Sequence, residues 1–298
     1  MPDIGVLMCG HGSRDPRGVR EFAGLADAVA RRFPHWTFGH GFLEFAEPTI
    51  ADGLDRLSRA GMKTVVAAPS LLFAARHAKT DIPSALKTNA NTGTDIRYAD
   101  PLGFDAKLLR AAADRIEEGE ASGKRAIARQ DTLLLVAGRG TSDADANSDL
   151  AKLTRLLSEG MQFGWSETCF SGVTEPQPAT ALDHAAKLGY GRVVVMPYFL
   201  FTGILVDRVY AATDESAVRY PDIEFIKAPY LNAHPLIVET FSERIIDALE
   251  RPKHLNRRHD HDHRHDDCDD AWHNHAPDHF ADPSDVYSLA PRNASGGR

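Results

Sequence analysis

Cysteine is scarce in this sequence, with three among 298 residues. The three thiols, Cys9, Cys169 and Cys268, lie far apart in the chain, and no C-x-x-C pair occurs. A disulfide framework or a cluster held by four thiolates is therefore excluded for a single chain. We expect neither an iron–sulfur cluster nor another prosthetic group.

Long apolar runs and an excess of basic charge are also missing. No run approaches the roughly 20 apolar residues that a membrane-spanning helix needs, and Asp3 stands where a secretory leader would carry basic residues. We therefore expect a cytoplasmic protein with no membrane partner. The net charge of −8 argues against nucleic acid as a partner, because phosphate binding needs concentrated Lys and Arg.

An internal repeat is the most informative feature that the sequence does contain. A shift of 128 positions aligns the two halves without a gap. The aligned pairs include Gly10 with Gly138, Gly12 with Gly140, Asp15 with Asp143, Glu47-Pro48 with Glu175-Pro176, Gly61 with Gly189, Pro69 with Pro197, and Pro101 with Pro229. The repeat predicts a tandem duplication with domains at residues 1–124 and 125–252, followed by a tail at residues 253–298.

Strand and helix signals alternate in each half. The apolar run IGVLM near the N-terminus predicts a buried strand, and apolar residues at spacings of three and four from Val19 to Phe33 predict a helix. Further strands are predicted near residues 38–45, 64–73 and 96–102, and Pro48 is expected in the first turn of the helix after the second strand. The second half repeats this order. The fold class is therefore α/β, with two domains that each hold a parallel sheet flanked by helices.

Three residues able to bind a proton or a metal follow the first three predicted strands, where ligands bind in such sheets. His11 follows the first strand, Glu44 ends the second, and His77 lies just beyond the third. The equivalent positions of the second half hold Arg139, Gly172 and Leu205. We therefore place the chemistry in the first half, with His11, Glu44 and His77 as catalytic and metal-binding candidates.

The segments around these residues resemble a known family. GHGSRD after the first strand, FLEFAEP after the second and PSLLFAARHAKTDIP after the third are similar to the sirohydrochlorin chelatases of cobalamin and sirohaem biosynthesis. The similarity covers residues 1–250 approximately and is greatest to the two-domain cobaltochelatase type. It implies two similar domains that face each other across a cleft for the tetrapyrrole. The family's two site histidines would correspond to His11 and His77, and its site carboxylate to Glu44.

The residue types suit that chemistry. A divalent ion must exchange water for pyrrole nitrogens while two N–H protons leave the macrocycle. Neutral imidazole suits Co²⁺, Fe²⁺ or Ni²⁺ and can serve as ligand or base, and a carboxylate can accept a proton or complete the coordination. We expect Gly10 and Gly12 to let the flat macrocycle come close to the imidazole of His11.

The implied substrate also requires cationic groups in an acidic protein, since sirohydrochlorin bears eight carboxylates. Basic residues beside the two histidines are candidates for binding them: Arg14, Arg17, Arg76 and Lys79. The metal ion is expected as a second substrate, with cobalt first and iron or nickel as alternatives. A chain that already contains both halves can act as a monomer.

The C-terminal tail has a composition of its own. Between His254 and His279 it holds eight of the chain's 14 histidines, interleaved with aspartates and almost without apolar residues. Such a segment cannot form a core, so we expect it to be disordered and to gather divalent transition metals.

Other classes of function fit less well. A histidine phosphatase needs an arginine directly before its nucleophile, where this chain has Gly10, and a serine hydrolase would show a G-x-S-x-G segment, which is absent. A ferrochelatase of the same family and a metallochaperone that binds no tetrapyrrole remain open.

Overall fold

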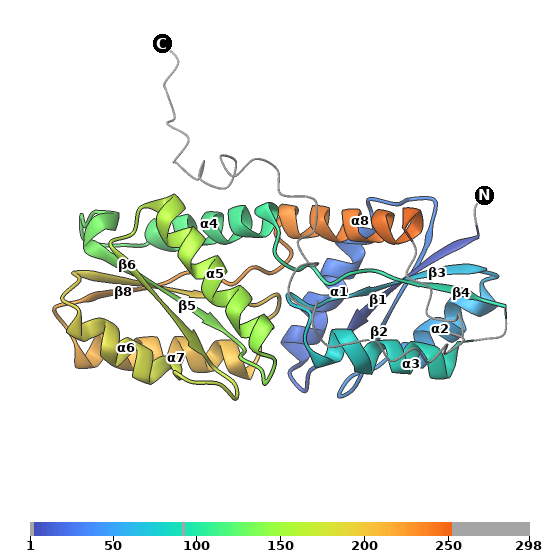
Figure 1. The fold of residues 1–298 in the computed structure, drawn as a ribbon, viewed down its shortest axis with the longest axis horizontal. Helices are drawn as coiled ribbons and strands as arrows, with labels where there is room; N and C mark the ends of the chain where they lie inside the picture. Colours follow the sequence, from blue (N-terminus) through green and yellow to red (C-terminus); the bar gives the residue numbers. More distant parts are fainter. Residues whose placement is uncertain (1–2, 91–92, 252–298) are drawn as a thin grey trace, which may run out of the picture.

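Two four-stranded parallel sheets form the framework of the structure, a computed structural model that describes residues 3–90 and 93–251 (Figure 1). The first sheet has the order β2-β1-β3-β4, with β1 (Ile4–Gly10), β2 (Thr37–Phe42), β3 (Thr64–Pro69) and β4 (Asp95–Tyr98). The second has the order β6-β5-β7-β8, with β5 (Thr132–Gly138), β6 (Trp165–Phe170), β7 (Arg192–Pro197) and β8 (Glu224–Lys227). All pairings are parallel, so the predicted fold class is confirmed.

Helices cover both faces of each sheet. Those of the first half are α1 (Pro16–Ala30), α2 (Ile50–Arg59), the π-helical turn η1 (His77–Asp81), α3 (Ile82–Asn89) and α4 (Ala106–Glu120). Those of the second half are the short η2 (Arg129–Asp131), α5 (Ala144–Met161), α6 (Pro178–Lys187), α7 (Ile204–Arg219) and α8 (Pro235–Glu250). None of the helices in the described ranges is long and apolar enough to cross a membrane.

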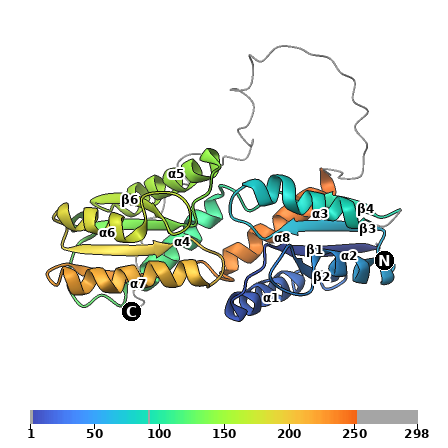
Figure 2. The same ribbon diagram turned by 90° about the horizontal axis from the view of Figure 1, so that it is seen from below.

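The last helices of the two halves are exchanged. Helix α4 packs against β7, β8 and α5, whereas α8 packs against β3, β4 and α1 (Figure 1). We call β1–β4 with α1–α3 and α8 the first lobe, and β5–β8 with α4–α7 the second lobe; Figure 2 shows them side by side. Each of these two helices therefore packs on the sheet of the other half, across the boundary between residues 124 and 125 that the repeat predicts.

Alternate residues of β1 explain why the sheet has helices on both faces. Val6 and Met8 belong to a buried cluster that includes residues of α1 and α8, while Leu7 and Cys9 belong to a second cluster with α2 and α3. The first cluster continues through α4 to β5 and β7, so one apolar core joins the two lobes.

Helix α2 begins at Ile50, two residues after Pro48. Thr49 is the N-cap, and a capping box with Asp52 closes the first turn. Pro48 precedes the cap in a cis peptide with Glu47, so its expected place in the first turn is wrong. The predicted metal-gathering tail, with Cys268, lies outside the described residues.

Candidate active site

His11 and Glu44 meet at the carboxyl end of the first sheet. The loop after β2 bonds to the turn after β1 through Leu43 N to Gly10 O, 2.9 Å, and Glu44 N to His11 O, 3.0 Å. The side chains also meet, with His11 Nε2 3.1 Å from Glu44 Oε1. The imidazole is mostly buried and the carboxylate half-exposed.

The two glycines beside His11 have a packing role. Gly12 has φ +96°, and a Cβ built there would lie 1.7 Å from the carbonyl oxygen of Glu44. A Cβ on Gly10 would lie 2.8 Å from the ring of Phe22. Protein atoms therefore occupy the place of a Cβ at both positions, and the glycines let the loop carrying Glu44 approach His11. Their expected role in the approach of a macrocycle to the imidazole stays a prediction.

His77 lies beside His11, although 66 positions separate them in the sequence. Their ring centroids are 4.4 Å apart with the planes at 79°, an edge-on contact. His77 is the first residue of η1, and π-helical turns of this kind are frequent at functional sites. The three residues that the sequence singled out thus lie together.

Sequence reasoning missed Asp81. Its Oδ2 lies 2.9 Å from Nδ1 of His77, and both side chains are about three-quarters buried. The signal was present in the segment HAKTD, because residues four apart on a helical turn face each other.

The surroundings of His11 favour the neutral imidazole. Burial lowers its pKa from the ordinary 6.5, and the nearby His77 and Arg139 act in the same direction, whereas the Gly12 carbonyl and Glu44 oppose them. The Gly12 oxygen lies 3.1 Å from Nδ1, and Oε1 of Glu44 lies 3.1 Å from Nε2. Both oxygens are acceptors, so the neutral ring can donate its one N–H to only one of them, and the other contact needs a further proton or a cation.

No ready-made metal cage surrounds these groups. Among the residues that the structure describes, no three His, Cys, Asp or Glu side chains are grouped closely enough to hold an ion. An ion at His11 and Glu44 would take its remaining ligands from elsewhere, such as the nitrogens of a bound substrate.

Two of the four predicted cationic residues pair across the lobes. Nη2 of Arg17, on α1, lies 2.6 Å from Oδ2 of Asp207 on α7. Nζ of Lys79, on η1, lies 2.7 Å from Oδ2 of Asp143 at the start of α5, and this contact lowers the pKa of the Asp143 carboxyl. In the alignment of the two halves, Lys79 corresponds to Asp207. This position therefore carries opposite charges in the two lobes, and in each lobe its side chain forms an ion pair with the other lobe.

The other two predicted cations lie on the first lobe. The guanidinium of Arg14 sits 4.6 Å above the ring of Phe45, which is itself 5.9 Å from the ring of His11. Arg76 is exposed, with its nearest carboxylate, that of Asp81, at 3.7 Å. Both guanidinium groups are accessible to an anionic ligand.

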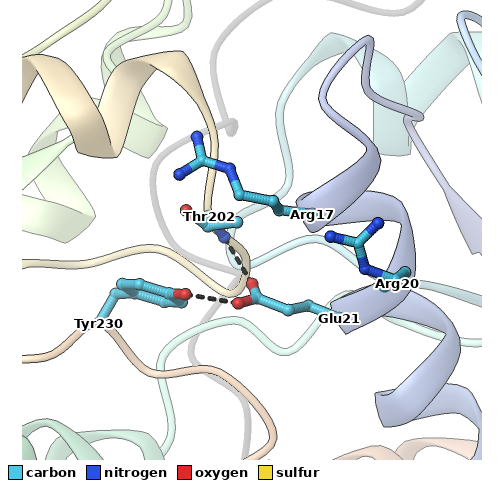
Figure 3. Close-up of a pocket in the computed structure, with 5 residues that line it drawn as sticks. All are labelled: Arg17, Arg20, Glu21, Thr202 and Tyr230. Atoms are coloured by element: carbon cyan, nitrogen blue, oxygen red, sulfur yellow. Dashed lines mark hydrogen bonds between the residues drawn. The ribbon is translucent and has the colours of Figure 1, made fainter.

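A pocket of about 430 Å³ lies between the lobes next to the pair formed by Arg17 (Figure 3). Arg17, Arg20 and Glu21 of α1 form one side, and Thr202 and Tyr230 of the second lobe form the other. The carboxylate of Glu21 accepts from Thr202 N at 2.7 Å and from the Tyr230 hydroxyl at 2.5 Å. These bonds hold the lobes together beside two guanidinium groups.

Comparison with known proteins extends these observations. A family model described as CbiX matches residues 5–119 and 133–248. A sirohydrochlorin cobaltochelatase of Priestia megaterium is 36% identical over an alignment of 259 residues, which covers 84% of this chain and 82% of the relative. A sirohydrochlorin ferrochelatase of the same organism is 28% identical over 242 residues, 80% of this chain and 88% of the relative. The structure of SirB from Bacillus subtilis with Fe³⁺ has a TM-score of 0.71 at 26% identity and covers 82% of this chain and 94% of its own.

Proposed function

The chain belongs to the CbiX family, and on that premise we propose that it is a sirohydrochlorin chelatase that inserts a divalent metal ion, cobalt in the first place, into the tetrapyrrole. The relatives with this activity match across both halves of the chain. The metal ion is a substrate of this reaction and leaves with the product.

The observation that carries the proposal is the contact between His11 and His77, with Glu44 beside it. Each divalent ion that enters the macrocycle displaces two pyrrole protons. The two imidazoles and the carboxylate supply three proton acceptors at one place. His11 and Glu44 can also hold a first-row ion, which displaces the proton between them. When the ion then passes to the pyrrole nitrogens, the vacated groups and His77 can accept the two protons of the ring.

Substrate carboxylates would be bound by the cationic residues around the site. Arg14 and Arg76 are exposed and are open to a carboxylate directly. Lys79 is paired with Asp143 of the second lobe, and Arg17 is shared between Asp207 of that lobe and Asp15 of its own. Substrate binding would therefore exchange Asp207 and Asp143 for carboxylates of the tetrapyrrole.

Cobalt is favoured by the identity to the cobaltochelatase, which exceeds that to the ferrochelatase. Iron is the second candidate, because imidazole and carboxylate bind both ions. We further propose that the enzyme acts in the cytoplasm in cobalamin biosynthesis, as a monomer, and that the histidine-rich tail gathers the metal ion.

The test is absorption spectroscopy of the purified protein with sirohydrochlorin and Co²⁺, Fe²⁺ or Ni²⁺ in turn. The proposal expects catalytic conversion of the sirohydrochlorin spectrum, fastest with Co²⁺. Fastest conversion with Fe²⁺ would make the protein a ferrochelatase. Binding of metal without any effect on the sirohydrochlorin spectrum would favour the metallochaperone.

A further inference from the structure

Asp81 makes a direct contact with one of the two site histidines. Its Oδ2 lies 2.9 Å from Nδ1 of His77, one turn earlier in the same π-helical segment. A carboxylate at this distance accepts the Nδ1 proton in a charge-assisted hydrogen bond. The neutral imidazole then carries its lone pair on Nε2.

Asp81 does not serve mainly in helix capping or in an ion pair, the two ordinary roles of an aspartate at such a place. Asp81 precedes α3, yet its side chain makes no capping hydrogen bond to that helix. Its contact with Arg76 is long, 3.7 Å, and that guanidinium is 83% exposed, so it contributes little. The close partner of the carboxylate is the imidazole.

The duplication gives an independent comparison within the same molecule. The shift that places Leu205 at the position of His77 places Val209 at that of Asp81. Val209 is fully buried in the apolar core of the second lobe. The half that lacks the imidazole therefore also lacks the carboxylate, and uses the position for packing.

We propose that Asp81 is the positioning residue of His77: it holds the Nδ1–H tautomer and so makes Nε2 the atom that meets the substrate. This inference rests on the proposed function for what Nε2 then does. His11 differs, because an acceptor lies 3.1 Å from each of its ring nitrogens, the Gly12 carbonyl at Nδ1 and the Glu44 carboxylate at Nε2.

Asp81→Ala removes the acceptor and Asp81→Glu retains one. Removal of a carboxylate that orients a site histidine typically lowers activity about 10- to 100-fold. We expect kcat for Co²⁺ insertion to fall by that factor in Asp81→Ala, with the KM for sirohydrochlorin within about threefold of wild type, and Asp81→Glu to recover part of the loss. The matched control is Asp55→Ala, which removes an exposed carboxylate that also pairs four residues along its helix, with Arg59, and should leave kcat unchanged.

A second readout needs no substrate. Nitrogen-15 NMR of the full chain, with the His77 signals assigned by their loss in His77→Ala, reports which ring nitrogen carries the proton. We expect the Nδ1–H form in wild type and a shift toward the Nε2–H form in Asp81→Ala. The same tautomer in both proteins, or a folded Asp81→Ala enzyme with wild-type kcat, would overturn the inference. A wild-type protein that inserts no metal would refute the proposed function, while the NMR result would still decide the role of Asp81.

Discussion

Replacement of Gly12 by alanine tests how the two loops of the site fit together. A methyl group there would lie 1.7 Å from the carbonyl oxygen of Glu44, and real Cβ atoms essentially never approach a heavy atom within 3.0 Å. The loop carrying Glu44 must therefore move by roughly 1 Å, a displacement that can cost about 100-fold in rate. Because Glu44 N bonds the carbonyl of His11, the contact between the two side chains should be lost as well.

The positive φ of +96° adds backbone strain of about 1–2 kcal/mol to the Gly12→Ala protein. Gly61 is a matched control, because its φ is +81° but nothing lies within 4 Å of the added methyl group. Urea denaturation should show the loss from backbone strain alone in Gly61→Ala, about 1–2 kcal/mol, and its rate of Co²⁺ insertion should equal that of wild type. Gly12→Ala with a rate within threefold of wild type, or an equal loss of rate in Gly61→Ala, would refute this reasoning.

Three further results follow from the structure. Phe241→Ala in α8 should lower the free energy of unfolding by about 3–5 kcal/mol and speed amide hydrogen exchange first in β3 and α1, which α8 contacts. Loss of protection confined to β5–β8 would contradict the packing of α8 on the first lobe. Asp207→Asn should tighten sirohydrochlorin binding about two- to fivefold, because the amide no longer competes as an anion for Arg17. The control Asp214→Asn, which breaks an ion pair within the second lobe, should have no effect. Unchanged or weaker binding to Asp207→Asn would exclude the exchange of Asp207 for a substrate carboxylate. Because burial lowers the pKa of His11 from 6.5, the fall in rate on acidification should have its midpoint below pH 6.5. A midpoint at or above 6.5 would contradict this lowering.

Periodicity and the internal repeat were sufficient to predict the two α/β units. The strand ends predicted near His11, Glu44 and His77 place these residues at one edge of the first sheet, as the structure has them. The exchange of α4 and α8 could not be predicted, because both helices are apolar on one face and fit either sheet. Which sheet each covers depends on the path of the chain between the lobes.

The chemistry of the site was more visible in the sequence than its geometry. The loss of imidazole and carboxylate from the second half singled out His11, Glu44 and His77. Their mutual distances depend on loop packing, such as the contact of Gly12 with the carbonyl of Glu44, which no pattern records. The pairing of Arg17 and Lys79 with the second lobe likewise depends on how the lobes meet.

The most direct test of the asymmetry between the two halves is Co²⁺ insertion into sirohydrochlorin by the double variant His11→Ala/His77→Ala. The control is His35→Ala/His184→Ala, which removes one exposed histidine from each half outside the site. We predict a loss of about 100- to 10,000-fold in kcat for the site variant, with sirohydrochlorin still bound, and a wild-type rate for the control. Insertion at the wild-type rate by the site variant would contradict the account.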